Sequence, residues 1–290
     1  MTEPQPVART AEDKQLLRHR VRASLFQPLG HAAGVPAVHI TSPLTRGGNY
    51  LYYWLWAHTN SLAGEKSRVQ HHDVIDEWLR EFPLLDALTV RKSIFLNVFA
   101  QWVSGHKHEF DMDFDREALT GFCREVVASS ARFQHRLSVL RQQIDDGTCV
   151  LNVRRGDYYA NPDLTPIYGI DIRKHVRESF EILESEGRTV SKVLFVSDDV
   201  AWCVENLAEL VPAEHGVIDD RRSMFDDLAA LATAPQLILA NSTFSFWGAF
   251  IGDALAPERV VIAPSRHLIA DDGTPYSATF DPRWRRTTAE

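Results

Sequence analysis

Short aliphatic runs alternate with amphipathic stretches along the second half of the chain. The runs predict β-strands, and the stretches between them, whose apolar residues recur at helical spacing, predict α-helices. The expected strands are residues 149–153, 192–197, 236–241 and 259–264, and the expected helices are residues 170–187, 199–210, 223–234 and 244–255. Continuous aliphatic strands separated by helices are typical of a parallel sheet covered on both faces. The pattern therefore predicts an α/β fold.

The first half of the chain opens with a shorter version of the same pattern. A β-type run at residues 35–40 is followed by a turn-rich segment at 41–49 and by an aromatic helical segment at 50–63, which is how a βα unit begins. One stripe of this helix is expected to pack against a sheet, and it consists of Tyr50, Tyr53, Trp54 and Ala57.

A long helix is predicted between the two halves. Apolar residues recur near 3.6 spacing over residues 115–144, and Gly147 follows directly after an acidic pair, as is typical of a helix end. A chain of 290 residues has the length of two domains of about 100–150 residues each. We therefore expect two α/β lobes, residues 1–145, which include the long helix, and residues 146–290.

Two adjacent arginines, Arg154 and Arg155, directly follow the first strand of the second lobe, with Gly156 after them. Ligands of parallel α/β sheets bind at the carboxyl ends of the strands. Arginine offers planar paired donors that match phosphate oxygens, and it keeps its charge. Spacing alone leaves two interpretations equally open: the pair binds a diphosphate-like anion, or it forms structural salt bridges, one of them with Asp157.

Polar residues also follow two further strands. Ser197 or Asp198 can cap the helix that comes next by accepting its free amide protons, or these residues can bind a nucleobase or ribose hydroxyls. Asn241, Ser242 and Thr243 lead directly into an aromatic helix. Amides and hydroxyls at a positive helix N-terminus can bind an anion, and the alternative is a plain N-cap.

Composition narrows the class of protein. With 44% hydrophobic and 24% charged residues the chain is an ordinary globular protein, and its net charge of −8 argues against nucleic acid as a partner. No apolar run approaches the roughly 18 residues of a membrane span, and the polar leader at residues 1–15 lacks the apolar core of a signal peptide. The three cysteines, Cys123, Cys149 and Cys203, form no CxxC pair. These features predict a cytoplasmic protein with reduced thiols, which leaves peripheral membrane association open.

The polar groups at the strand ends resemble, in order, the sequence blocks of the α-1,2-fucosyltransferase family (glycosyltransferase family 11-like) and, more distantly, those of α-1,6- and protein O-fucosyltransferases. The family's His-x-Arg-Arg-Gly-Asp-Tyr block is similar to residues 152–158, and its Ser-Asp-Asp block with a following tryptophan is similar to residues 195–202. Its Asn-Ser-Ser-Phe-Ser-Trp-Trp-Gly-Ala block and the Ile-Ala-Pro that follows are similar to residues 241–249 and 262–264. Residues 48–52 are an imperfect counterpart of its Gly-Asn-Gln-Leu-Phe loop.

The resemblance implies a GT-B-like fold, in which two Rossmann-type lobes enclose a cleft. Residues 1–145 would form the acceptor-side lobe, and residues 146–290 would bind the donor, GDP-fucose, for an inverting transfer without a metal. Arg154 would hold the β-phosphate with support from Arg155, and Asp198 would lie near the nucleotide. Further donor contacts are expected from Gly48, Asn49, Ser197, Asn241, Ser242, Thr243 and Ser245.

We therefore expect a glycosyltransferase that moves fucose, or a related deoxyhexose, from a GDP-sugar to a hydroxyl of a glycan acceptor. Asp157 is the candidate general base. The alternatives are that Asp157 orients Arg154 or Tyr158, and that the leaving diphosphate takes the proton. Because Asn152 replaces the family's histidine, a catalytically silent nucleotide-sugar-binding protein also remains open.

Two other classes of function are disfavoured. A hydrolase or sulfotransferase that uses the arginines would need a P-loop or an evident nucleophile such as a GxSxG turn, and the sequence has neither. A metal site is not expected either, because no histidine lies in an HExxH pattern or beside a convincing set of carboxylates. The histidines considered are His71, His72, His106 and His108.

Overall fold

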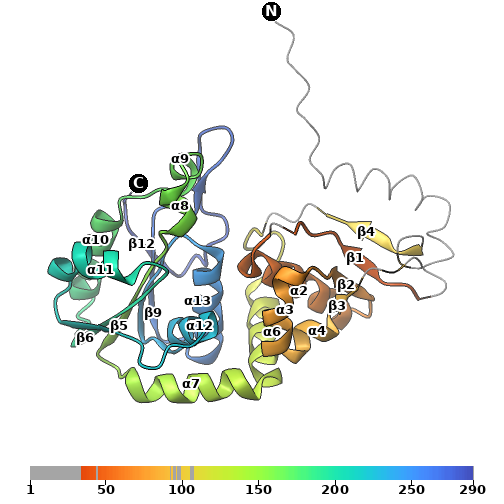
Figure 1. The fold of residues 1–290 in the computed structure, drawn as a ribbon, viewed down its shortest axis with the longest axis horizontal. Helices are drawn as coiled ribbons and strands as arrows, with labels where there is room; N and C mark the ends of the chain where they lie inside the picture. Colours follow the sequence, from red (N-terminus) through yellow and green to blue (C-terminus); the bar gives the residue numbers. More distant parts are fainter. Residues whose placement is uncertain are drawn as a thin grey trace, which may run out of the picture. The chain divides into compact units, whose positions relative to one another are not determined.

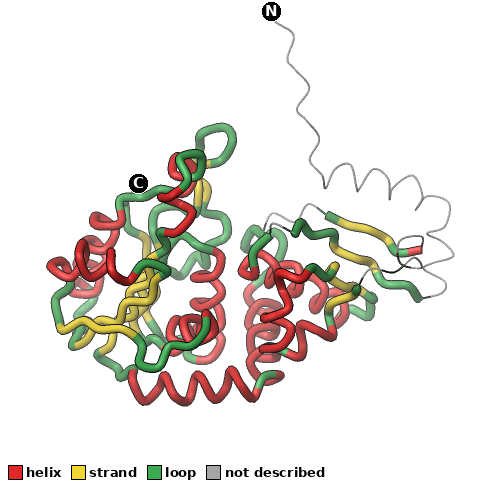
Figure 2. Tube along the Cα trace, viewed as in Figure 1, coloured by secondary structure: helices red, strands yellow, loops and turns green. Residues whose placement is uncertain are grey.

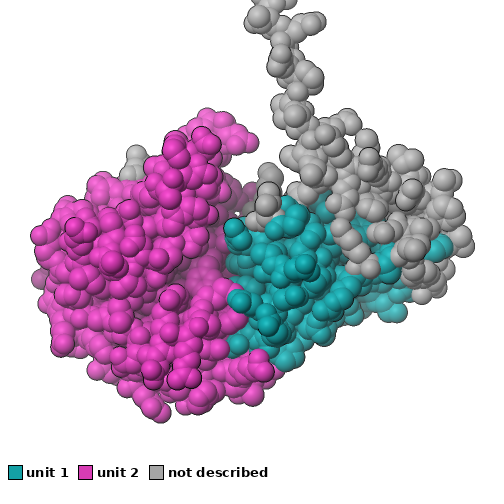
Figure 3. All heavy atoms as spheres, viewed as in Figure 1, with its two compact units in different colours: residues 1–107 teal, residues 108–290 magenta. Residues whose placement is uncertain are grey.

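Helices and strands alternate in both parts of the chain, which the computed structural model divides after Lys107 into unit 1 (residues 1–107) and unit 2 (residues 108–290) (Figures 1 and 3). The structure describes residues 34–43, 45–91, 93, 96, 99–104 and 108–289. The leader predicted at residues 1–15 and the candidate His106 lie outside these ranges. Among the described residues, no helix combines the length and the apolar character that crossing a membrane requires.

Unit 1 contains a four-stranded parallel sheet with the strand order β3-β2-β1-β4 (Figure 2). The strands are β1 (Ala37–His39), β2 (Ser67–Gln70), β3 (Thr89–Val90) and β4 (Gln101–Val103). The described helices are α2 (Gly47–Leu62), η1 (Asp73–Ile75), α3 (Asp76–Glu81) and α4 (Pro83–Ala87). The βα unit predicted at the start of this part of the chain is confirmed.

Helix α2 packs its aromatic stripe against the sheet of unit 1, as predicted. Tyr50, Trp54 and Ala57 are fully buried, and the Trp54 indole donates a hydrogen bond to Thr89 Oγ1 in β3 at 2.9 Å. The ring of Tyr53 stacks on His39 of β1 with the centroids 4.1 Å apart. The rings therefore serve as core in this helix.

Unit 2 is built on a six-stranded parallel sheet with the order β12-β9-β8-β5-β6-β7. The strands are β5 (Thr148–Val153), β6 (Lys192–Ser197), β7 (Glu214–Val217), β8 (Gln236–Ile238), β9 (Val260–Ala263) and β12 (Arg285–Arg286). A separate antiparallel pair consists of β10 (Leu268–Ile269) and β11 (Pro275–Tyr276). The four strands predicted for this part of the chain are all present, and with the sheet of unit 1 they confirm the α/β class with two parallel-sheet lobes.

Helices cover both faces of the sheet in unit 2, with α10 and α11 on one side and α12 and α13 on the other (Figure 1). The helices are α6 (Arg116–Ser129), α7 (Ala131–Gln143), α8 (Gly156–Ala160), α9 (Thr165–Tyr168), α10 (Ile172–Ser185), α11 (Val200–Leu207), η2 (Ala208–Leu210), α12 (Met224–Thr233) and α13 (Thr243–Leu255). Side chains of β5, β6, β8 and β9 form a continuous buried cluster with residues of α10 and α11. Burial on both faces explains why the strands read as uninterrupted aliphatic runs.

The segment 115–144 forms two helices, where the sequence pattern predicted one. Ser130 has an extended backbone (φ −119°, ψ 102°), and its hydroxyl caps α7 by accepting the Phe133 N–H. Helix α6 packs on α13, where Phe122 contacts Trp247 edge-on at 5.8 Å, and α7 contacts α12 through the Arg136–Asp226 ion pair. These contacts place both helices in unit 2, so the boundary lies after Lys107 and not at residue 145.

Candidate active site

The register of the neighbouring strands β5 and β6 of unit 2 brings the arginine pair next to Asp198. Val153 at the end of β5 lies opposite Ser197 at the end of β6. Asp198 forms an ion pair with Arg154 Nη1 through Oδ2 and accepts a hydrogen bond from the Arg155 backbone N–H through Oδ1, both at 2.9 Å. A Cβ on Gly156 would lie 2.5 Å from this Oδ2. Asp198 therefore ties the end of β6 to the turn after β5, and glycine leaves room for the contact.

Arg154 remains partly open to solvent between two carboxylates. Its side chain is 38% exposed, and besides Asp198 it contacts Asp157, with Nη2 to Oδ1 at 2.7 Å. The guanidinium also lies 5.8 Å from the centroid of the Tyr158 ring. The salt bridge to Asp157 that the sequence left open is thus present. Its exposure leaves the guanidinium accessible to an anion.

Arg155 is held in a different way, by contacts with two aromatic rings. Its guanidinium carbon lies 4.0 Å from the centroid of the Trp202 ring and 5.1 Å from that of Tyr159. Its Nε lies 3.3 Å from Asp199 Oδ2. Trp202 and Asp199 belong to a sequence block noted for its resemblance, but neither was among the expected site residues.

The helix after β6 is capped by Asp199, so the expectation that Ser197 or Asp198 caps it is wrong. Asp199 Oδ1 accepts the Trp202 N–H at 3.1 Å, and the Ser197 hydroxyl accepts the Asp199 N–H at 2.9 Å. Helix α11 begins at Val200, and the cap is the residue that directly precedes the first helical residue. The Asp-x-x-Trp spacing fits this arrangement and could have identified the cap from the sequence.

The residues around the start of α13 divide into structural groups and groups at the helix terminus. Asn241 Nδ2 donates to the backbone carbonyls of Tyr168 and His267 at 2.7 and 3.0 Å. Ser245 is buried, and its hydroxyl donates to Asn152. Ser242 is the N-cap residue but makes no side-chain capping bond, and Thr243 is the first residue of the helix. Ser242 and Thr243 are therefore the residues that could contact an anion at the positive helix terminus.

Asn152, which stands where the resembling family has histidine, cross-links three elements. Its Nδ2 donates to the Val196 carbonyl of β6 at 2.9 Å, and its Oδ1 accepts from the Ser245 hydroxyl of α13 and from the Ala240 N–H. The side chain is only 7% exposed. The amide thus holds β5, β6 and α13 together at the edge of the sheet where the arginines lie.

Two stacked tyrosines lie beside Arg154. The rings of Tyr158 and Tyr168 are 4.5 Å apart and 12° from parallel. Burial, followed by the nearby Tyr168, raises the pKa of Tyr158 above its ordinary value of 10.0, although a side-chain hydrogen bond from Ser242 opposes the shift. At neutral pH the Tyr158 hydroxyl therefore keeps its proton and can donate a hydrogen bond.

Gly48 and Asn49 belong to unit 1, whereas the other expected site residues all belong to unit 2. Helix α2 begins at Gly47, so both residues lie in its first turn and not in the preceding loop. A Cβ on Gly47 would lie 2.0 Å from Trp78 Nε1, and glycine at this position lets the helix start directly against that indole. Gly48 is buried and Asn49 is half-buried.

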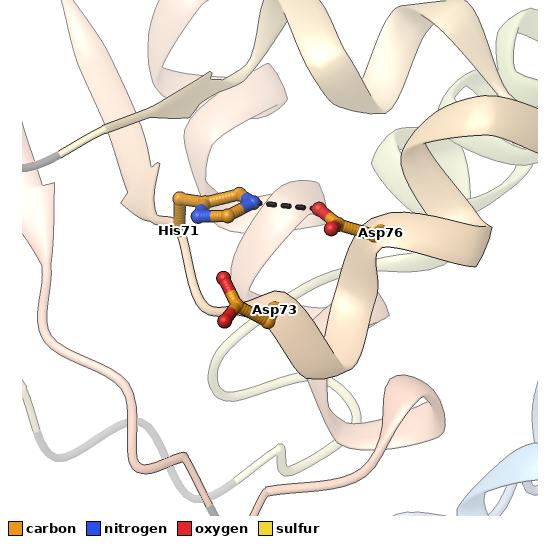
Figure 4. Close-up of side chains that lie close together, drawn as sticks. All are labelled: His71, Asp73 and Asp76. Carbon is orange, nitrogen blue, oxygen red and sulfur yellow. Dashed lines mark hydrogen bonds and ion pairs between the residues drawn. The ribbon is translucent and has the colours of Figure 1, made fainter.

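One histidine of unit 1 has two carboxylates beside it. His71 Nε2 lies 2.7 Å from Asp76 Oδ1, and Asp73 offers a third ligand atom, with all three within 4.8 Å of one another (Figure 4). The hydrogen bond with His71 lowers the pKa of Asp76. Sequence inspection found no convincing carboxylate set near the histidines, and this group contradicts that observation. The hydrogen bond accounts for the pair without a metal, and the metal-free reaction stays a prediction.

Unit 2 has arginine and hydroxyl groups at the carboxyl ends of the strands of a parallel sheet. This arrangement is typical of the class of α/β proteins that bind their ligands at this edge of the sheet. Within this class, residues 61–284 match the model of glycosyl transferase family 11, and the chain belongs to that family. The predicted family is thereby confirmed.

Individual relatives match shorter parts of the chain. The chain is 26% identical over 122 residues to the O-antigen biosynthesis glycosyltransferase WbnK of Escherichia coli. The aligned residues cover 41% of this chain and 38% of that protein. The chain is 31% identical over 103 residues to an alpha-1,2-colitosyltransferase of Escherichia coli, and this alignment covers 35% of each chain. The alignments thus span little more than a third of either relative.

Solved structures of fucosyltransferases are similar at low identity. POFUT1 in complex with GDP is 13% identical with a TM-score of 0.40, over 86% of this chain and 78% of that one. The NodZ alpha-1,6-fucosyltransferase soaked with GDP-fucose is 13% identical with a TM-score of 0.41, over 74% of this chain and 92% of that one.

Proposed function

We propose that this protein transfers fucose, or a related deoxyhexose, from a GDP-sugar to a hydroxyl of a glycan, with inversion and without a metal. Membership of glycosyl transferase family 11 supports the reaction class, and a relative is named an alpha-1,2-colitosyltransferase. The observation that carries the proposal is the Arg154 guanidinium, which lies 38% exposed at the carboxyl end of a buried strand. We place the reaction in the cytoplasm, with which the three unpaired, buried cysteines are consistent.

Arg154 is the group that binds the β-phosphate in this proposal. Negative charge grows on the diphosphate as the glycosidic bond breaks, so a fixed cation stabilises the transition state more than the ground state. Ser242 and Thr243 add hydroxyls at the positive end of α13. Arg155, whose guanidinium lies over the Trp202 and Tyr159 rings, would support Arg154 in binding the phosphate.

Two groups can accept the proton of the acceptor hydroxyl in this proposal. Asp157 is the predicted general base, but its ion pair with Arg154 supports the alternative that it orients the arginine. The leaving diphosphate can take the acceptor's proton in that case. Unit 2 would bind the donor and unit 1 the acceptor. The donor contacts of Gly48 and Asn49, which lie in the first turn of α2, stay a prediction.

Calorimetric titration with GDP tests the proposal. We expect the wild-type protein to bind GDP and Arg154→Ala to bind it at least about tenfold more weakly, because a lost charge-assisted contact is worth about 1.5–3 kcal/mol. Thermal unfolding should change little, because exposed ion pairs contribute about 0–1 kcal/mol. Arg285→Ala is a matched control, since Arg285 is 41% exposed and ion-paired with Glu186; it should bind GDP like the wild type.

Two outcomes would count against the proposal in different ways. No detectable wild-type binding at millimolar GDP, with Arg154→Ala behaving alike, would remove the donor site. GDP binding without transfer or donor hydrolysis would instead favour the catalytically silent binding protein. A transfer assay in excess chelator addresses the metal: the rate should persist, and restoration of a lost rate by a divalent cation would contradict a metal-free reaction.

A further inference from the structure

The two adjacent arginines are restrained by different kinds of contact. Arg154 is held by two carboxylates and is 38% exposed, whereas Arg155 is 23% exposed and its guanidinium carbon lies over two aromatic rings. A guanidinium is weakly hydrated on its faces and carries its N–H donors in its plane. Rings stacked on the faces therefore fix the plane and leave its edge for hydrogen bonds.

The ring of Trp202 is the closer of the two, and it is itself fixed in place. Its backbone N–H is bound by the Asp199 side chain, and its backbone carbonyl accepts from Asn206 Nδ2 at 2.9 Å. The half-buried indole also packs on the apolar cluster of the central sheet. Asp199 thus caps the helix that carries Trp202 with one oxygen and faces Arg155 Nε with the other.

The second ring, that of Tyr159, is anchored as well. Its hydroxyl donates to the Ile170 carbonyl at 2.9 Å and accepts the Ile170 N–H at 3.1 Å. The ion pair of Arg155 with Asp199 uses Nε. Within the part of the chain that the structure describes, the two terminal nitrogens of Arg155 therefore remain as donors for a ligand.

We propose that Trp202 is a positioning residue, which fixes the Arg155 guanidinium by stacking on its face so that its terminal nitrogens are directed at the diphosphate of the nucleotide sugar. The inference rests on the proposed function, since it assigns Arg155 a phosphate to bind. An arginine fixed before the ligand arrives loses less conformational freedom on binding. Trp202 thereby contributes to donor affinity without touching the donor.

The test is a double-mutant cycle that combines Trp202→Leu with Arg155→Ala. Removing a cation–π contact should weaken GDP binding by about 2- to 30-fold, which corresponds to about 0.5–2 kcal/mol. Trp202→Phe retains an aromatic face and should bind GDP more tightly than Trp202→Leu. In the Arg155→Ala background, Trp202→Leu should cause no further loss of affinity, because the contact is already absent.

A merely structural role for Trp202 gives a different result. Trp202→Leu would then lower the melting temperature and leave GDP affinity unchanged, or it would weaken binding equally with and without Arg155; either result overturns the proposal. If the wild-type protein binds no GDP, the proposed function fails and this inference fails with it. Thermal unfolding of the wild type, the two single variants Trp202→Leu and Arg155→Ala and the double variant then still tests whether Trp202 and Arg155 interact. Additive effects of the two substitutions on stability would show that they do not.

Discussion

Replacing Asp157 by asparagine separates its two predicted roles, because they change different quantities. As a general base, Asp157 would take the proton of the acceptor hydroxyl. As the partner of Arg154, at 2.7 Å, it competes with the diphosphate for the same guanidinium. Asparagine is nearly isosteric but uncharged, so the variant removes both the proton acceptor and the competing charge.

The exposure of the ion pair sets the size of the effect. The side chains of Arg154 and Asp157 are 38% and 49% exposed, and a pair as exposed as this contributes about 0–1 kcal/mol. Arg154 keeps its second partner, Asp198, in the variant. We therefore expect Asp157→Asn to bind GDP up to about fivefold more tightly and to keep turnover within about tenfold. Loss of a general base would instead lower turnover by about 10²–10⁴ without tightening GDP binding.

Calorimetry with GDP and a transfer assay at saturating donor measure the two quantities separately. The gain in affinity should shrink at high salt, because the charges are exposed and screened. Asp163→Asn is a suitable control, since Asp163 is an exposed carboxylate a few residues further along the chain, and it should change neither quantity. A fall in turnover of about a hundredfold or more, with unchanged GDP affinity, would refute the counter-ion role and assign the base to Asp157.

Three further predictions follow from burial and close packing. Gly156→Ala should weaken GDP binding, because the added Cβ would lie 2.5 Å from the Asp198 carboxylate, and equal calorimetric affinity would contradict this. Burial lowers the pKa of His175 and of His267 from 6.5 to about 4. Between pH 6.5 and pH 4 these histidines are therefore protonated in the unfolded chain but neutral in the folded one. Stability present above pH 6.5 should fall as the pH drops toward 4, by about 2 kcal/mol per histidine at pH 5, as denaturant titrations at pH 7 and pH 5 would measure. The three cysteines are buried and their pKa values are raised by that burial, so mass spectrometry should find them alkylated only in denaturant.

The sequence predicts most of the sheet in unit 2 because that sheet is buried on both faces. Strand β6 occurs at the predicted residues 192–197, and β5 extends the prediction by one residue, Thr148. Two edge strands gave no such signal. Strand β7 is largely exposed, and β12 consists of two exposed arginines, so neither presents an aliphatic run. Their strand conformation comes from pairing with β6 and β9, which is a tertiary effect.

The candidate site could be located from the sequence, but the partners within it could not. Strand ends in a parallel sheet share one edge, and this rule alone brings Arg154 near Asp198. Which residue caps α11 depends on where the helix begins, and a shift of one residue moves the cap from Asp198 to Asp199. The inward orientation of Ser245, toward Asn152, likewise depends on how α13 packs on the sheet.

The charges at the site suggest different roles for Arg154 and Arg155 in the proposed binding of a diphosphate. Within the described residues, Arg154 and Arg155 form ion pairs with three carboxylates, those of Asp157, Asp198 and Asp199, so the group carries a net negative charge before any ligand binds. In the proposed function, a diphosphate would therefore compete with these carboxylates for the arginines. The pair of Arg154 with Asp157 is the most exposed of the three and so the least costly to break. Arg155, whose guanidinium lies over the Trp202 and Tyr159 rings, would keep its position when an anion binds. In the proposed function, Arg154 would thus exchange its carboxylate partner for the phosphate, while Arg155 would provide a cation whose position does not change.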